Sequence, residues 1–430
     1  MTLLLDNISI IPMTASNLVI EKGYIIIEGN LIKKIGEGQA PEGNYDRVID
    51  GTNKAALPGF VNTHTHAAMT LLRGYADDLP LMEWLETKIW PLEAKLTADD
   101  IYWGTMLAIV EMIKSGTTTF HDMYFCMDRV AQAVEKTGIR AVLARGMVGV
   151  GPESELAFTQ SRELIEQWHQ AANGRIKFRL GPHAPYTCPP DYLTRVIDLA
   201  GELQVGIHIH LAETIGEVND CVQQFNKTPI ELMESLGLFK HQVLAAHCVH
   251  VTPGDIDILK KYNAGVAHNP ESNMKLSSGI APVPDMLNAG IPVALGTDGA
   301  SSNNNLDMLQ EMRSCAMLHK VNTLNPTVIP AGQALEMATA NGAIALGMEQ
   351  EVGRLEPGMK ADIILMDLSP AHMTPRYDIL ANIVYSAQAS DVLTVIVDGN
   401  IIMEDREIKT IDEQEVLGKC RSIAQRLVKG

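Results

Sequence analysis

Positive charge is scarce in this chain, and its scarcity excludes whole classes of partner. Lysine and arginine account for 34 of the 430 residues against 52 aspartates and glutamates, which gives a net charge of −18. Nucleic acids and anionic membranes require basic patches, so we expect neither as a partner. No apolar run approaches the roughly 18 residues of a bilayer span. The start of the chain also lacks the basic segment and cleavage site of a signal peptide, so we expect no secretion.

Cysteine is also scarce, and its spacing excludes a disulfide framework. The six cysteines are Cys126, Cys188, Cys221, Cys248, Cys315 and Cys420. They contain no CxxC pair, a pattern typical of reduced thiols in a cytoplasmic enzyme, and we expect no catalytic thiol. Linkers rich in glycine, serine or proline are missing as well, so any two structural units should pack closely against each other.

Short apolar segments that end at a polar residue are abundant in the middle of the chain. Eight of them occupy residues 55–61, 117–120, 140–144, 176–180, 205–209, 243–246, 265–267 and 291–296. They are apolar on both faces, as in the strands of a covered parallel sheet, and the intervening segments are long enough for crossover helices. Residues 99–114, for example, repeat apolar side chains at helical spacing. The pattern predicts a (β/α)8 TIM barrel over residues 56–350, with catalytic groups at the C-terminal ends of its strands.

The two ends of the chain share a second pattern. Residues 24–27 and 31–32 flank a turn at Gly29, and residues 395–397 and 401–403 flank a turn at Gly399, so each end predicts a β-hairpin. We expect residues 1–55 and 351–430 to combine into one small β-sandwich beside the barrel, followed by a terminal helix.

Histidines and one aspartate occupy several of the polar strand ends. His64 and His66 stand two residues apart on one strand, so both imidazoles point to the same side. An isolated HxH pair is weak evidence. His210 follows the fifth segment, His247 the sixth and Asp298 the eighth, and strand ends of a barrel converge at one rim. The sequence therefore predicts a metal site there.

Longer motifs carry a resemblance to a known family. They are PGFVNTHTH at 58–66, HLAET at 210–214, HCVH at 247–250, HNPESNMKLSSG at 268–279, GTDGASSNNN at 296–305, ATANGAIALG at 338–347 and GRLEPGMKADIILMD at 353–367. Together they resemble the amidohydrolase superfamily and, within it, the 5-methylthioadenosine/S-adenosylhomocysteine deaminases, over nearly the whole chain. The resemblance implies that His64, His66, His210 and Asp298 bind one divalent metal ion, usually zinc.

The resemblance also implies a reaction, hydrolytic release of ammonia from the 6-amino group of 5′-methylthioadenosine, S-adenosylhomocysteine or adenosine. A metal held by three neutral imidazoles can lower the pKa of a water from ~15.7 toward ~7. Asp298 would accept the released proton, His247 would hold the oxyanion, and Glu213 would protonate the purine N1 and then relay a proton to the leaving amine. Glu213 and Asp298 could instead cap helices.

Other histidines and the substrate contacts are interpreted separately. We interpret His121, His208 and His250 as core histidines. Taken alone, His247 would be interpreted in the same way. By the resemblance, Glu93 takes the ribose hydroxyls, His183 bonds the purine, and Arg145 faces the far end of the substrate, where it would pair with the homocysteine carboxylate. Some family members use a second arginine further on. Residues 150–160 contain none, which leaves Arg162 as the substitute.

Several alternatives stay open at this point. Lys177 begins the fourth segment rather than ending it, so a carboxylated lysine bridging two metals is disfavoured. Guanine deaminase, cytosine deaminase and chlorotriazine hydrolase would share the metal site and differ in the pocket. A non-enzymatic scaffold would normally have lost the ligands. We expect a homo-oligomer acting on a small adenine nucleoside thioether.

Overall fold

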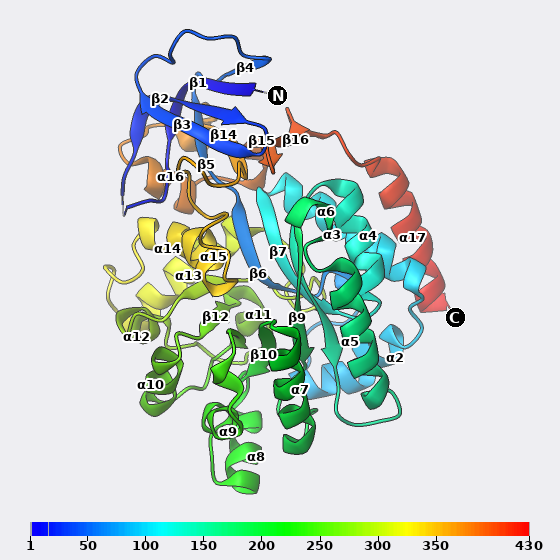
Figure 1. Ribbon diagram of the computed structural model, residues 1–430. Coiled ribbons are helices and arrows are strands. Elements are labelled where there is room, and N and C mark those ends of the chain that lie inside the picture. Colours follow the sequence, from blue (N-terminus) through cyan, green and yellow to red (C-terminus); the bar gives the residue numbers. More distant parts are fainter. Residues whose placement is uncertain (1, 16, 430) are drawn as a thin grey trace.

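A parallel barrel forms the centre of the molecule. The computed structural model describes residues 2–15 and 17–429, and within these residues eight parallel strands follow one another in chain order (Figure 1). The strands are β6 (Phe60–Thr65), β7 (Thr117–Tyr124), β8 (Arg140–Met147), β9 (Ile176–Pro182), β10 (Ile207–Leu211), β11 (Val243–His247), β12 (Gly265–His268) and β13 (Val293–Leu295). All of their residues are buried except Lys177, which is half-buried. The predicted (β/α)8 barrel is confirmed.

The first and last strands are joined where the site lies. Thr63 Oγ1 donates to the carbonyl of Leu295 at 2.8 Å, and the Asp298 N–H donates to the carbonyl of His64 at 2.9 Å. Gly296 permits this approach, because a Cβ there would lie 2.8 Å from the backbone nitrogen of His64. The end of β13 thus brings the aspartate of the last strand against the histidines of the first.

Helices cover the barrel. The helices around the barrel include α3 (Ala98–Lys114), α4 (Met127–Thr137), α5 (Ser154–Trp168), α7 (Pro190–Leu203), α8 (Ile215–Phe225), α9 (Pro229–Leu236), α10 (Pro253–Lys261), α11 (Pro270–Lys275), α12 (Val283–Asn288), α13 (Met308–Thr323), α14 (Ala331–Ala338) and α15 (Ala340–Ala345). The short segments α1 (Leu81–Trp84), η2 (Leu85–Ile89) and α2 (Trp90–Glu93) lie between β6 and α3. The predicted helix 99–114 corresponds to α3, which starts with a capping box between Thr97 and Asp100. No helix in residues 2–15 and 17–429 has the length and apolar character of a membrane span.

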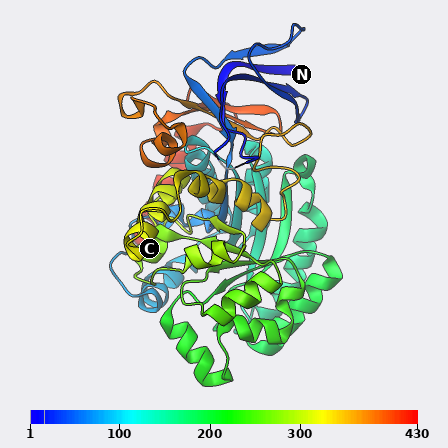
Figure 2. The same ribbon diagram turned by 90° about the vertical axis from the view of Figure 1, so that its left-hand side faces the viewer.

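The two chain ends share one sheet. In the described residues it contains β1 (Thr2–Ile10), β2 (Ile20–Glu28), β3 (Leu31–Glu37), β4 (Arg47–Asp50), β5 (Lys54–Pro58), β14 (Ile363–Asp367), β15 (Val392–Val397), β16 (Asn400–Glu404) and β17 (Glu407–Ile408). Both predicted hairpins are present, as β2–β3 and β15–β16. Antiparallel pairing of β5 with β14 unites the two ends, and apolar side chains from both form one core cluster. Figure 2 shows this sheet at one end of the barrel.

One strand prediction was wrong in its extent. Residues 55–61 are not a single strand, because β5 belongs to the terminal sheet and only β6 belongs to the barrel. Gly59 separates them, and a Cβ at this position would lie 2.1 Å from the side chain of Thr118. Both strands are buried and apolar, so hydrophobic pattern alone does not reveal the break.

A buried arginine fastens the barrel to the terminal sheet. Arg140, at the start of β8, is fully buried and donates to Asp362 at 2.8 and 3.0 Å. It also lies 3.5 Å from a carboxylate oxygen of Asp398, in the β15–β16 turn, and the Asp398 N–H donates to Asp362 at 2.8 Å. The helix α17 (Glu413–Lys429) packs against α3, where Arg426 contacts Asp100.

Candidate active site

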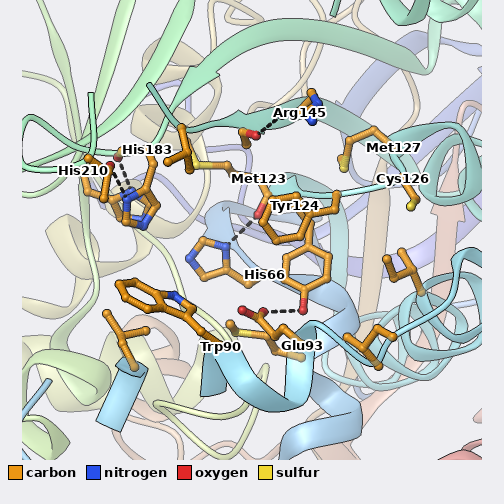
Figure 3. A pocket seen from close by; sticks show the side chains of 18 of the residues that line it. His66, Trp90, Glu93, Met123, Tyr124, Cys126, Met127, Arg145, His183 and His210 are labelled. Carbon is orange, nitrogen blue, oxygen red and sulfur yellow. Dashed lines mark hydrogen bonds between the residues drawn. The ribbon is translucent and has the colours of Figure 1, made fainter. Parts of the chain in front are cut away.

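A cavity of about 1040 Å³ opens at the C-terminal ends of the barrel strands. Strand ends supply one part of its wall, and the segment from α1 to α2 supplies another (Figure 3). The predicted residues that line it are Glu93, Arg145, His183, Glu213, His247, Asp298, His66 and His210. His64 lies directly behind them and has no exposed surface. The sequence-predicted residues therefore meet at one place, with Arg162 as the exception.

The four predicted metal ligands lie close together. One ligand atom each from His64, His66 and His210 lie within 4.8 Å of one another, and the same holds for His64, His247 and Asp298. The Asp298 Oδ1 atom is 3.4 Å from Nε2 of His64 and 3.3 Å from Nε2 of His66. Three imidazoles and a carboxylate thus surround a common centre.

Hydrogen bonds orient the imidazoles toward that centre. His66 Nδ1 donates to the carbonyl of Met123, and His210 Nδ1 donates to the carbonyl of His183, each at 2.7 Å. These bonds leave the Nε2 lone pairs free to act as ligands. His64 Nδ1 contacts Nε2 of His208 at 2.8 Å, and among the described residues the buried Nε2 of His64 has no hydrogen-bond partner.

The electrostatics suit a cation. Burial lowers the pKa of His64 to about 4 and also lowers the pKa of His210, so both imidazoles are neutral at pH 7. Burial alone would raise the pKa of Asp298, but the neighbouring His64 and His66 hold it well below its usual value. A buried, partnerless imidazole nitrogen beside an ionised carboxylate matches the nitrogen and oxygen ligands that divalent metals such as zinc bind. The residues present fit a divalent metal ion.

Asp298 is held by hydrogen bonds from its own loop and from α11. Asp298 has a left-handed backbone, with φ of 60°. Its Oδ2 accepts from the hydroxyls of Ser272 at 2.6 Å and Ser302 at 3.1 Å, and its Oδ1 accepts from the Gly299 N–H at 2.8 Å. These bonds leave Oδ1 facing the histidines.

Glu213, which follows β10, and His247, the last residue of β11, lie beside this centre. His247 Nε2 lies 3.7 Å from Glu213 Oε2, and its Nδ1 donates to Asn273 Oδ1 at 2.9 Å. The Ser278 hydroxyl lies 3.4 Å from Glu213 Oε1. Burial raises the pKa of Glu213. Burial would lower the pKa of His247, but the carboxylates of Glu213 and Asp298 raise it above its usual value.

The predicted substrate contacts have hydrogen-bond partners of their own. Glu93 accepts a hydrogen bond from the Tyr124 hydroxyl at 2.5 Å, and burial raises its pKa. His183 Nδ1 contacts Thr187 Oγ1 at 2.9 Å. Arg145 donates from Nε to Gln160 at 2.8 Å and from Nη1 to a backbone carbonyl at 2.6 Å. Arg145 is buried and makes no ion pair with any carboxylate among the residues described.

Arg162 does not belong to the site. It lies on the outer surface, paired with Glu202 at 2.7 and 2.8 Å, and does not line the cavity. The prediction that Arg162 serves as a second substrate-binding arginine is therefore wrong. His268, at the end of β12, also turns away and contacts His319 of α13 at 3.1 Å.

Some residues of the site were not found from the sequence. Tyr124 and Gln160 contact Glu93 and Arg145, and no local pattern marks them. Ser272 and Asn273, by contrast, stand within the HNPESNMKLSSG motif, whose polar residues could have been assigned to the support of Asp298 and His247.

Comparison with known proteins gives one family match and several proteins that are similar in sequence or in fold. The family model described as Amidohydrolase family matches residues 55–402. A protein of Syntrophomonas wolfei subsp. wolfei named 5-methylthioadenosine/S-adenosylhomocysteine deaminase is 72% identical over 429 residues, with 100% of both chains covered. An adenosine deaminase from Xanthomonas campestris with bound zinc is 33% identical with a TM-score of 0.95, covering 100% of this chain and 99% of its own. A zinc-bound atrazine chlorohydrolase from Arthrobacter aurescens TC1, 23% identical with a TM-score of 0.91 and 98% and 100% coverage, shares the fold.

Proposed function

The chain belongs to the amidohydrolase family, and we propose that it is a metal-dependent deaminase that releases the 6-amino group of 5′-methylthioadenosine and S-adenosylhomocysteine as ammonia. The observation that carries this proposal is the convergence of three imidazoles and Asp298 beside Glu213 and His247, at the base of a cavity large enough for a nucleoside. The name of the 72% identical relative supports the choice of substrate.

We assign one zinc ion to His64, His66, His210 and Asp298. The zinc bound by the structural relative from Xanthomonas campestris supports the choice of metal. A single ion is supported by Lys177, which lies at the start of β9, away from the rim, and pairs with Glu351. When bound, the ion would lower the pKa of a water toward neutrality and so make that water a nucleophile at neutral pH.

The side chains around the ion provide the proton transfers. Asp298, already ionised, accepts a proton from the attacking water. Glu213, whose pKa is raised by burial, gives its proton to N1 of the purine as the new C–O bond forms at C6. His247 carries Nε2–H when protonated, as its raised pKa favours, and donates to the oxygen at C6.

The second half of the reaction breaks the C–N bond. The hydroxyl proton at C6 passes through Glu213 to the amine nitrogen, ammonia leaves, and the ring is left as the 6-oxo purine with its proton on N1. The proton held by Asp298 then returns to Glu213 through solvent, and the starting state is restored. Each residue ends with the proton it began with.

The distal cavity supplies the binding contacts. Glu93 presents acceptor oxygens to the two ribose hydroxyls, with Tyr124 holding its other side. His183 bonds the purine. Arg145 is a buried guanidinium without a carboxylate partner among the described residues, and the homocysteine carboxylate of S-adenosylhomocysteine provides one.

The setting of the enzyme is also part of the proposal. All six cysteines are free thiols, which supports a reducing compartment such as the cytoplasm. We also retain the expectation of a homo-oligomer, which light scattering of the purified protein tests directly.

A substrate panel tests the assignment. Zinc-loaded protein is assayed with 5′-methylthioadenosine, S-adenosylhomocysteine, adenosine, guanine, cytosine and a chlorotriazine, and release of ammonia or chloride is followed. We expect turnover of the two thioether nucleosides with ammonia release. Asp298→Asn, which removes the proton acceptor, is the matched inactive control. Turnover of a free base or the triazine alone would make the nucleoside assignment wrong.

A further inference from the structure

The turn that carries Glu213 is tied down on both sides. Ala212, which precedes it, has a left-handed backbone with φ of 52°, a conformation that is unfavourable for a non-glycine residue. The Ala212 carbonyl accepts from the N–H groups of Val249 and His250 at 3.0 and 2.9 Å. On the other side, the N–H groups of Ala212 and Glu213 both donate to the carboxylate of Glu217, each at 2.9 Å.

The bonds of Glu217 differ from those of an ordinary helix cap. Thr214 caps α8, and its hydroxyl accepts from the Glu217 N–H at 3.2 Å. In a capping box the acid at this position returns to the N–H of the cap residue. Glu231 does so in α9, where it accepts from the Thr228 N–H at 2.8 Å. The Glu217 carboxylate instead accepts from the N–H groups of Ala212 and Glu213, which precede the cap residue Thr214.

Glu217 is also buried, with 7% of its surface exposed. Burial, opposed by the two N–H groups and reinforced by the nearby Glu213, raises its pKa to about 7. A carboxylate is expensive to bury unless it is fully bonded, and two charge-assisted bonds to adjacent peptides meet that need. An ordinary surface cap would not require this burial.

We propose that Glu217 is a positioning residue for the reaction, because its carboxylate fixes the Ala212–Glu213 peptide and thereby keeps the Glu213 side chain aimed at the substrate. The proposal depends on the acid role assigned to Glu213 under the proposed function. A negative charge on Glu217 also favours the protonated, proton-donating form of Glu213. The other titratable groups that face Glu213 are His66 after β6, Tyr186 after β9, His247 from β11 and Asp298 after β13.

Two substitutions separate the geometry from the charge. Glu217→Gln has one acceptor oxygen for two N–H groups and no charge, whereas Glu217→Asp keeps the charge but is one methylene shorter. We expect kcat to fall in both variants by on the order of tenfold to a hundredfold, with KM changing less, because a misplaced catalytic group costs about this much. The alkaline limb of the pH profile moves to lower pH in E217Q and stays in place in E217D. Zinc content is unchanged in both.

Glu231→Gln is the matched control, because it removes the same kind of acceptor from an ordinary capping box. It should lower Tm and leave kcat unchanged. If E217Q loses stability as E231Q does but keeps the wild-type kcat and pH profile, Glu217 is only a helix cap and the proposal is overturned. If E217Q does not fold, a wild-type kcat in E217D overturns it. The ratio of variant to wild-type kcat is measured with whichever substrate the wild type deaminates. A wrong substrate assignment would then appear in the wild type itself and would not be mistaken for a failure of the proposal about Glu217.

Discussion

Replacing Arg145 should separate the two proposed substrates. The guanidinium is buried and has no carboxylate partner among the residues described, and its Nη2 group finds no hydrogen-bond acceptor there. A carboxylate on the substrate would therefore make a new charge-assisted contact, worth roughly 1.5–3 kcal/mol. That energy corresponds to about tenfold to 150-fold in kcat/KM. Arg145→Met keeps an apolar stem of similar length and removes this contact together with the two hydrogen bonds that Arg145 donates to Gln160 and to a backbone carbonyl.

The expected result is a selective loss. For S-adenosylhomocysteine, kcat/KM falls by the factor above, chiefly through KM, because the contact lies far from C6 and forms equally in the bound and transition states. For 5′-methylthioadenosine, which has no carboxylate, kcat/KM stays at the wild-type value. Arg162→Met, an arginine that does not line the cavity, is the control and should change neither substrate. Equal losses for both substrates in R145M would refute an anion-binding role for Arg145.

Four further predictions concern the metal, the general acid and the contact between the barrel and the terminal sheet. Removing the metal with a chelator should abolish ammonia release and lower Tm, since a ligand at a thousand times its Kd stabilises by ~4 kcal/mol; zinc should restore both, and an unchanged Tm would argue against the site. The pKa of Glu213 is raised and its acid form is the active one, so kcat/KM should be full below that pKa and decline as pH rises through it. Glu213→Gln should lose about 10²- to 10⁴-fold in kcat, and a smaller loss would exclude general acid catalysis. Arg140→Met leaves the buried carboxylate of Asp362 without an ion-pair partner among the described residues and leaves Asp398 with Lys360 alone, so urea unfolding should show a loss of about 3–5 kcal/mol, while a loss below ~1 kcal/mol would mean that the ion pair is dispensable.

Much of the barrel and of the ligand set can be predicted from the sequence. The strands are short, apolar on both faces and followed by polar residues, which is a strong local signal. The paired His64 and His66 end such a strand, and barrel topology brings His210 and Asp298 to the same rim. The break at Gly59 carries no comparable signal, because the strands on either side belong to two different sheets that are both buried.

Residues that act through distant partners were not predictable in this way. Arg162 was interpreted as facing the cavity, whereas the structure presents Gln160 of the same helix there. Two residues along an α-helix turn the side chain by about 200°, so Gln160 and Arg162 point to opposite sides. The role of Tyr124 likewise depends on where β7 and α2 meet, which no local pattern specifies.

The pairing of β5 with β14 has a consequence for how the chain is made. Pro58 of β5 pairs with Ile363 of β14, so β5 has no partner on this edge until roughly 300 more residues have been synthesised. At cellular rates of translation this delay is on the order of 15 to 60 s. During that time the edge of β5 is an open template for other nascent chains. The mixed sheet can close only after the catalytic barrel has been synthesised, which makes its completion a late event in biogenesis.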